Sequence, residues 1–164
     1  MNADELDRCM RAYYKCVYGM ALCRCKSPAD ADDIAQDVFL KLFLYDGTFD
    51  SEPQLKAWLM RCTVNHSINL VKSGWHRLSR PLDDVAEILA PVLGGESGTL
   101  LPLILKLGRN NRTALYLYYY ERYTVEETAR ITGVSVTAVR SRLARGRQQL
   151  KKLIESERYK ENGL

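Results

Sequence analysis

Apolar residues recur at helical spacing along most of the chain and predict a series of helices. Over residues 3–24 the apolar side chains fall three or four positions apart, which is the repeat of one face of an α-helix. Similar stripes cover residues 28–44 and 53–72. The alternation of apolar and polar positions that marks a strand is not found in the sequence. We therefore predict an all-α protein.

The second of these helices has a clear beginning. Ser27 precedes Pro28, and three aspartates, Asp30, Asp32 and Asp33, follow within the first turn. Serine is a preferred N-cap, proline suits the first helical position, and carboxylates are stabilised near a helix N-terminus. The helix is expected to run to about residue 44 and to end in a turn.

The helical pattern is interrupted between residues 79 and 99. Prolines and glycines exclude a long helix there: Pro81, Pro91, Gly94, Gly95 and Gly98. We predict two small helical domains, residues 1–78 and 100–164, joined by a flexible linker of residues 79–99. In the second domain helical spacing resumes over residues 100–107 and 110–121.

Residues 124–150 carry the pattern of a helix-turn-helix. Thr124 and Glu127 have the spacing of a capping box, so a helix is predicted over residues 125–131. Gly133 suits the left-handed backbone that ends a helix, and Ser135 can cap the next one. The inner face of that second helix is an apolar stripe at steps of three and four: Val136, Val139, Leu143, Gly146 and Leu150.

The outer face of this second helix is basic. Residues 138–152 include six arginines and lysines and no acid. The helical period places Ala138, Ser141 and Arg145 roughly opposite the apolar stripe, and Arg140 nearer its edge, where it suits a phosphate. A solvated basic face is the alternative, but the two capped helices and the glycine turn favour DNA recognition. The candidate DNA-binding residues are Ser135, Thr137, Ala138, Arg140, Ser141, Arg142 and Arg145.

The charge distribution points to more than one partner. The formal net charge is only +4, yet acids gather in residues 30–37 and bases in residues 138–152. Such polarity suggests two different partners, one of them nucleic acid. No apolar run is long enough to span a bilayer, and the polar N-terminus does not resemble a signal peptide. We expect no membrane insertion and a cytoplasmic location.

The cysteines and tyrosines each allow a packing role and a functional one. Five cysteines, an odd number, predict reduced thiols, and the seven-residue spacing of Cys9, Cys16 and Cys23 predicts packing. A metal site formed by Cys23, Cys25, Cys62 and His66 is the alternative. The tyrosines at 116, 118, 119, 120 and 123 could stack on bases, but packing is the commoner role. We predict no metal and no cofactor.

Three segments resemble the extracytoplasmic-function (ECF) group of bacterial RNA polymerase sigma factors. SVTAVRSRLARGRQQL, residues 135–150, resembles the helix that reads the minus-35 promoter element. DADDIAQDVFLKLF, residues 30–43, resembles the region 2 helix that grips the polymerase clamp. LKAWLMRCTVN, residues 55–65, resembles the helix that opens and reads the minus-ten element. Their order and spacing match over nearly the whole chain.

The resemblance implies a promoter-specificity subunit and not an enzyme. The implied partners are core RNA polymerase, through its clamp coiled coil and flap, promoter DNA, and an anti-sigma factor. In the holoenzyme the protein would be associated with the nucleoid. The residues implied to bind the clamp are Asp33, Gln36 and Asp37, with Phe39 or Leu40 as an apolar anchor. Those implied to capture minus-ten bases, with the preceding loop at 48–53, are Arg61, Asn65, Asn69 and Lys72.

Several positions depart from the family pattern. Val64 and Asn69 stand where arginine and aspartate are usual, so minus-ten recognition is expected to differ. Gly108 replaces a proline. Gly146 replaces an alanine in a helix interior, where glycine costs up to about 1 kcal/mol. Close helix contact or bending would each account for it.

Two other classes of function remain as alternatives. A stand-alone helix-turn-helix regulator would explain the C-terminal domain but leaves the acidic helix and the third helix without a task. An enzyme acting on nucleic acid is disfavoured because no HExxH, phosphate-binding loop or nucleophile motif occurs.

Overall fold

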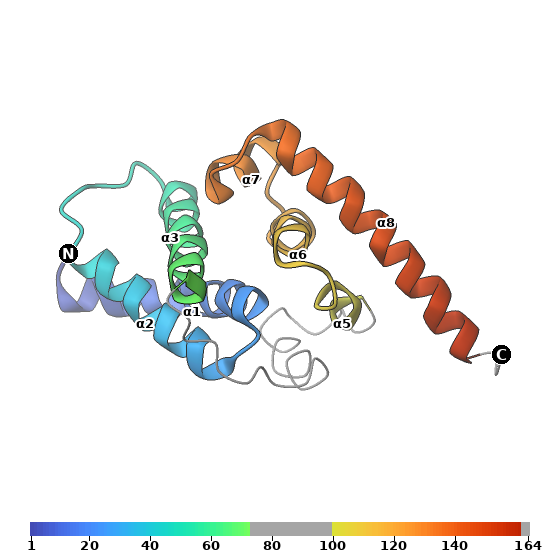
Figure 1. Ribbon diagram of the computed structural model, residues 1–164. Coiled ribbons are helices and arrows are strands. Elements are labelled where there is room, and N and C mark those ends of the chain that lie inside the picture. Colours follow the sequence, from blue (N-terminus) through green and yellow to red (C-terminus); the bar gives the residue numbers. More distant parts are fainter. Residues whose placement is uncertain (73–99, 162–164) are drawn as a thin grey trace.

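The computed structural model describes residues 1–72 and 100–161, and every regular element in those two ranges is a helix (Figure 1). The all-α prediction is confirmed. The N-terminal unit contains α1 (Ala3–Cys25), α2 (Pro28–Phe43) and α3 (Glu52–Lys72). The C-terminal unit contains α5 (Leu101–Ile104), α6 (Arg109–Leu115), the π-helix η1 (Tyr116–Tyr120), α7 (Val125–Thr132) and α8 (Val136–Glu161). The linker predicted at 79–99 lies outside the described residues.

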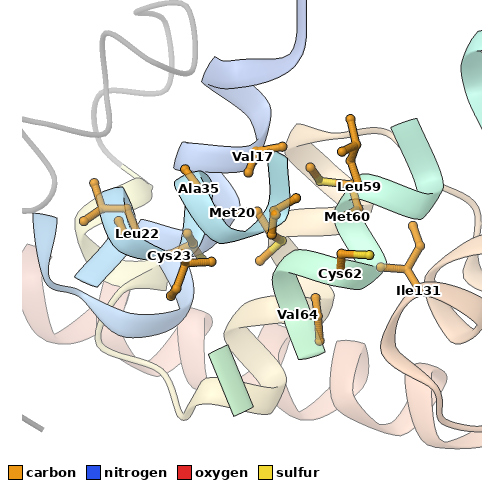
Figure 2. Close-up of a cluster of buried hydrophobic side chains, with 14 of the residues drawn as sticks. Val17, Met20, Leu22, Cys23, Ala35, Leu59, Met60, Cys62, Val64 and Ile131 are labelled. Carbon is orange, nitrogen blue, oxygen red and sulfur yellow. The ribbon is translucent and has the colours of Figure 1, made fainter. Parts of the chain in front are cut away.

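The N-terminal unit is a bundle of three helices whose starts are fixed by polar caps. Asn2 and Glu5 form a capping box at α1. At α2 the predicted cap is present, since the Asp30 backbone N–H donates to Ser27 Oγ at 3.3 Å. Both helices pack on α3, and the centre of the bundle is filled by fully buried Met20 and Leu59 (Figure 2).

The C-terminal unit contains the predicted helix-turn-helix. Thr124 and Glu127 exchange both hydrogen bonds of a capping box, and Gly133 ends α7 in the left-handed region at φ +73°. Ser135 Oγ accepts the backbone N–H of Ala138 at 3.0 Å and caps α8. Val139 and Leu143 of α8 are buried in a small core with α6 and α7. The stripe predicted along α8 therefore does face inward.

Two features of this unit differ from the sequence prediction. The helix expected over residues 110–121 changes into the π-helix η1 at Tyr116. A π-helix makes a wider turn than an α-helix. Tyr116 and Leu117, two consecutive residues of this turn, are both buried, and a regular spacing of 3.6 residues per turn does not predict this pair. In addition, α8 continues to Glu161, well beyond residue 150. Leu153 continues the inner stripe of α8, and Lys106 Nζ lies 3.5 Å from Glu157 Oε1 in an ion pair.

The two units are in direct contact. Between the N-terminal bundle and α8 lie α6 and α7 (Figure 1), with α6 against α1 and α7 against α3. Ile131 of α7 belongs to the same buried cluster as Leu59 and Cys62 of α3 (Figure 2). One apolar core thus extends across both units.

Gly146 is explained by the close approach of α8 to α6. A Cβ at this position would lie 2.7 Å from Leu115 Cδ1 and 3.2 Å from Leu115 Cγ. Leu115 is fully buried and has little room to move. Of the two explanations that the sequence allows, the structure supports close helix contact.

We predict that Gly146→Ala lowers the free energy of unfolding by about 1 kcal/mol. Overpacking a core costs roughly 1–3 kcal/mol, which outweighs the gain of up to about 1 kcal/mol in helix propensity. Urea denaturation followed by circular dichroism measures the change. Gly108→Ala is the control, because a Cβ there meets nothing within 4 Å. Alanine is a poorer N-cap for α6 than glycine but restricts the unfolded chain, so the two effects should leave a change within about 0.5 kcal/mol. A stabilised Gly146→Ala protein would show that the contact imposes no constraint.

Candidate nucleic-acid and polymerase interfaces

The basic face of α8 is solvent-accessible along its first half. Thr137, Arg140 and Arg145 are exposed, and Ser141 and Arg142 are half-buried beside them. Ser135 is exposed at the cap and Ala138 is half-buried in the first turn. All seven predicted residues thus lie on one helix, and the first turns of a recognition helix are those that reach base edges in a major groove.

Arg147 forms a second basic feature, which the sequence did not single out. Its Nε donates to the hydroxyl of Tyr119 at 2.8 Å. The guanidinium carbon also lies 5.7 Å from the ring centre of Tyr118 and 5.6 Å from that of Tyr119, within the range of cation–π contacts. Tyr118 and Tyr119 belong to η1 and Arg147 to α8, so the three residues are far apart in sequence. The tyrosine-rich run is the sequence feature that points to this contact.

The tyrosines divide between two roles. Tyr116 and Tyr123 are buried, in agreement with packing, and burial raises the pKa of the Tyr116 hydroxyl well above its usual value. Tyr119 is half exposed and holds Arg147. Packing is therefore confirmed for the buried pair, while Tyr119 remains accessible next to the basic helix.

The polar stripe predicted on α3 begins with two exposed side chains, Arg61 and Asn65, one turn apart. The side chains of Asn69 and Lys72, near the end of α3, lie outside the described residues. Arg61 lines a cleft of about 370 Å³ between α3 and α7. Its walls are Pro53, Gln54, Ala57, Trp58 and Arg61 on one side and Glu127, Arg130 and Ile131 on the other.

An aromatic cluster organises the loop that leads into α3. Tyr45, Phe49 and Trp58 pack with ring centres 5.1–5.6 Å apart. Lys41 Nζ lies 6.0 Å from the centre of the Trp58 ring. Contacts of this kind stabilise beyond the burial of area alone. The cluster fixes the loop against the start of α3, beside Arg61.

The acidic face of α2 is accessible, and the two candidate apolar anchors differ in burial. Asp33, Gln36 and Asp37 are exposed. Of the two candidate anchors, Leu40 is 56% exposed, whereas Phe39 is 2% exposed and stacks on Tyr14. Phe39 lies on the side of α2 that faces α1. It is therefore a core residue and not a docking residue.

Two further apolar side chains extend this surface at the end of α2. Phe43 is 40% exposed and Leu44 is 66% exposed. They follow Leu40 at helical steps of three and four. In the sequence, Phe43 and Leu44 fall at the end of the predicted helix, and no binding role is predicted for either. Together with Leu40 they form an exposed apolar patch next to the acidic side chains, which we call the α2 patch.

The cysteines show no arrangement for metal binding within residues 1–72 and 100–161, where no group of three or more potential ligands converges. All five thiols are free. Burial raises the pKa of Cys16 to about 12 and those of Cys23 and Cys25 to about 11. Thiols with such raised pKa values remain protonated at neutral pH and are poor metal ligands and nucleophiles.

None of the described helices combines the length and the apolar character needed to cross a lipid bilayer.

Two family models match the chain in succession. Sigma-70 region 2 covers residues 9–77, and sigma-70 region 4 covers residues 98–150. Among similar proteins, the ECF RNA polymerase sigma factor SigM of Mycobacterium tuberculosis is 26% identical over 90% of this chain and 76% of its own length. SigW of Bacillus subtilis, also an ECF sigma factor, is 29% identical over 75% of this chain and 74% of its own length.

Solved structures show the same fold. CnrH, in complex with the cytosolic domain of CnrY, has a TM-score of 0.68 at 23% identity and covers 94% of this chain and 90% of that one. RpoE of Bartonella quintana, in complex with the anti-sigma factor NepR, has a TM-score of 0.70 at 18% identity and covers 93% of this chain and 98% of that one.

With both regions matched in order and ECF relatives aligned over most of their length, the chain belongs to the sigma-70 family and to its ECF group of RNA polymerase sigma factors.

Proposed function

We propose that this promoter-specificity subunit acts through three surfaces: α8 for the minus-35 element, α3 for the minus-ten element and the α2 patch for core RNA polymerase. The observation that carries the proposal is the order and exposure of these surfaces on one helical chain. A basic helix face, a polar stripe beside a cleft, and an acidic and apolar patch are all accessible.

At the minus-35 element, α8 would enter the major groove by its first turns. Arg145 and Ser141 occupy the centre of the exposed face, where a guanidinium can bond a guanine edge in bidentate form. Arg140 and Arg142 lie to either side and suit phosphates, which position the helix without reading sequence. Arg147, held by Tyr119, lies on the Arg140 side and would add a phosphate contact.

At the minus-ten element, Arg61 and Asn65 would hold bases that have left the stack. Single-stranded bases are bound by stacking on aromatic side chains and by charge along the backbone. Trp58, in the cleft next to Arg61, provides a ring face, and Arg61 provides charge. Asn69 and Lys72 complete the proposed stripe. Trapping unpaired bases in this way favours the melted promoter.

At core polymerase, the α2 patch would combine an apolar anchor with complementary charge. Leu40, Phe43 and Leu44 supply apolar area, and Asp33, Gln36 and Asp37 supply polar contacts. Apolar side chains at the centre of an interface carry most of the affinity, and surrounding charges steer association. The clamp coiled coil is the proposed partner of this patch, and the flap is the proposed partner of the C-terminal unit.

The remaining assignments follow from family membership. The protein is proposed to act by binding and not by catalysis, in the cytoplasm, and at the nucleoid when it is part of the holoenzyme. An anti-sigma factor is the proposed regulator, since CnrH and RpoE were each solved with a bound partner protein. The stand-alone regulator is the weaker alternative, because α2 and α3 would then have no role.

Transcription reconstituted with core polymerase tests the function and the role of α8 together. The chain should support initiation from promoters with two elements, and Arg145→Ala should relax the choice of minus-35 sequence. A bidentate contact to a base is worth about 1–3 kcal/mol, or roughly 5- to 150-fold in discrimination. Ser141→Ala should have a smaller effect at a neighbouring position. Selection from a randomised minus-35 library measures both.

Arg158→Ala provides the matched control, because it removes the same charge from the distant, exposed end of α8 and should leave the selected sequence unchanged. Tight binding of a palindromic duplex without polymerase, together with no stimulation of initiation, would instead support the stand-alone regulator.

Affinity for core polymerase tests the α2 patch. Leu40→Asp should weaken binding about 30-fold, since burying a leucine contributes roughly 2 kcal/mol and the new carboxylate would be desolvated. Asp33→Arg should also weaken binding by reversing a charge. Fluorescence anisotropy with labelled sigma factor measures both dissociation constants. Ala12→Asp adds the same charge at an exposed position of α1 and should bind like the unaltered chain. Equal affinities for all four proteins would exclude the patch.

A further inference from the structure

Positive charge gathers where the end of α1 meets the start of α6. Arg24 is in the last turn of α1 and Lys26 is its C-cap, while Arg109 and Arg112 lie in the first turn of α6. Arg142 of α8 acts on the same region, since its charge contributes to lowering the pKa of Arg24. We call these five residues the cation cluster. It brings together charges from three helices that are far apart in sequence.

Hydrogen bonds to uncharged groups hold two of these arginines in place. Arg112 Nε donates to the Cys23 carbonyl at 2.7 Å, Nη2 to the Arg24 carbonyl at 3.1 Å and Nη1 to the Leu107 carbonyl at 2.8 Å. Arg24 Nη1 donates to Thr113 Oγ1 at 2.9 Å. Each of the two arginines is only 4% exposed. The bonds fix both guanidinium groups, but none of the acceptors carries a negative charge that would neutralise them.

No carboxylate compensates the cation cluster within residues 1–72 and 100–161. None of the ion pairs in this part of the chain includes a member of the cluster. The C-terminal end of α1 supplies some negative potential, equivalent to about half a unit charge. The cations therefore meet with little opposing charge, and each one raises the electrostatic energy of the others.

The repulsion within the cluster is expressed in two pKa values. Burial and then the neighbouring Arg109 lower the pKa of Arg24 to about 10, with further contributions from Arg112 and Arg142. Burial also lowers the pKa of Lys26, and Arg112 is the next cause. A guanidinium with a pKa of about 10 is still charged at neutral pH. The protein therefore does not relieve the repulsion by releasing that proton, whereas a bound anion would relieve it.

Two donors of the cluster are buried without a hydrogen-bond partner. Neither Arg24 Nε nor Arg109 Nε has one among the described residues. A buried donor left unpaired is costly, and such exceptions are expected where a protein binds an ion. Lys26, Arg109 and Arg142 are only half-buried, so the cluster can be reached from solvent. Lys26 also has φ +56°, and a lysine at this position adds a charge that the usual glycine would lack.

We infer that the cation cluster is a binding site for a compact, multiply charged phosphate, such as inorganic pyrophosphate or the diphosphate of a nucleotide. Guanidinium groups match phosphate oxygens in bidentate pairs. A singly charged anion would leave most of the cluster uncompensated. Lys26 and Arg109, which are accessible, would contact the ligand, and the buried Arg24 and Arg112 would attract it from behind. The site is a property of the chain alone and does not rest on the proposed promoter contacts.

Isothermal titration calorimetry of the full-length chain tests the site without polymerase or DNA. Sodium pyrophosphate, added at constant ionic strength, should bind as one ion per chain and about tenfold or more tighter than orthophosphate, because it carries more charge. Arg109→Gln and Lys26→Gln should each weaken binding about tenfold or more, as expected when a charge-assisted hydrogen bond is lost. Tighter binding of ADP than of pyrophosphate would assign the site to a nucleotide, and equal or weaker binding would assign it to the inorganic ion.

Arg8→Gln is the matched control, because it removes the same charge from an exposed position near the start of α1 and should leave the pyrophosphate affinity unchanged. Circular dichroism shows that each variant is folded. The basic face of α8 is the competing site on this chain, and Arg145→Gln tests it. An affinity that falls in Arg145→Gln but not in Arg109→Gln would overturn the inference, as would the lack of saturable binding.

A second measurement locates the ion on the unaltered chain and so avoids any effect of substitution on folding. Nitrogen-15 NMR of arginine side chains follows the Nε–H groups, and pyrophosphate should shift those of Arg24 and Arg109. The Nε–H of Arg147, which donates to the Tyr119 hydroxyl on α8, provides the reference and should not move. Shifts at Arg147 with none at Arg24 and Arg109 would place the ion outside the cluster and overturn the inference.

Discussion

Small helical bundles enclose little apolar surface, and this constraint shapes the whole chain. Three helices leave the side of α3 near Leu59 and Cys62 open, and the helix-turn-helix has Ile131 on the side away from its own recognition helix. In the structure each unit covers what the other leaves exposed. The same contact brings Arg61 of α3 and Arg130 of α7 to the walls of one cleft, so the packing that completes the shared core also forms this cleft.

The sequence predicted the local elements well because their determinants are local. Caps at Ser27 and Thr124, the left-handed turn at Gly133 and the inner stripe of α8 each depend on residues within one or two turns. The π-helix at Tyr116 and the contact between the units depend on residues distant in sequence, as Arg112 and Cys23 illustrate, and no periodicity encodes them. The helical period also separates Phe39 from Leu40, because Phe39 lies at the edge of the stripe of Ile34, Val38 and Leu42 and Leu40 lies opposite that stripe.

The three proposed surfaces also differ in how far the sequence defines them. For α8, helical period alone gave the accessible face, because the core stripe is regular. For α2, helical period places Leu40, Phe43 and Leu44 away from the buried stripe of Ile34, Val38 and Leu42, and their measured exposure agrees with that placement. Arg147 and Tyr119 needed the three-dimensional arrangement entirely, since η1 and α8 bring them together.

The tyrosine support of Arg147 has a thermodynamic consequence. A free arginine side chain samples many rotamers and loses about 2 kcal/mol of conformational entropy when it is fixed. The guanidinium carbon of Arg147 lies 5.7 Å and 5.6 Å from the ring centres of Tyr118 and Tyr119, and its Nε donates to the Tyr119 hydroxyl, so part of its freedom is lost before any phosphate arrives. An anion that binds this guanidinium would meet a preorganised site. Little conformational entropy would then be lost to offset the favourable enthalpy of the contact.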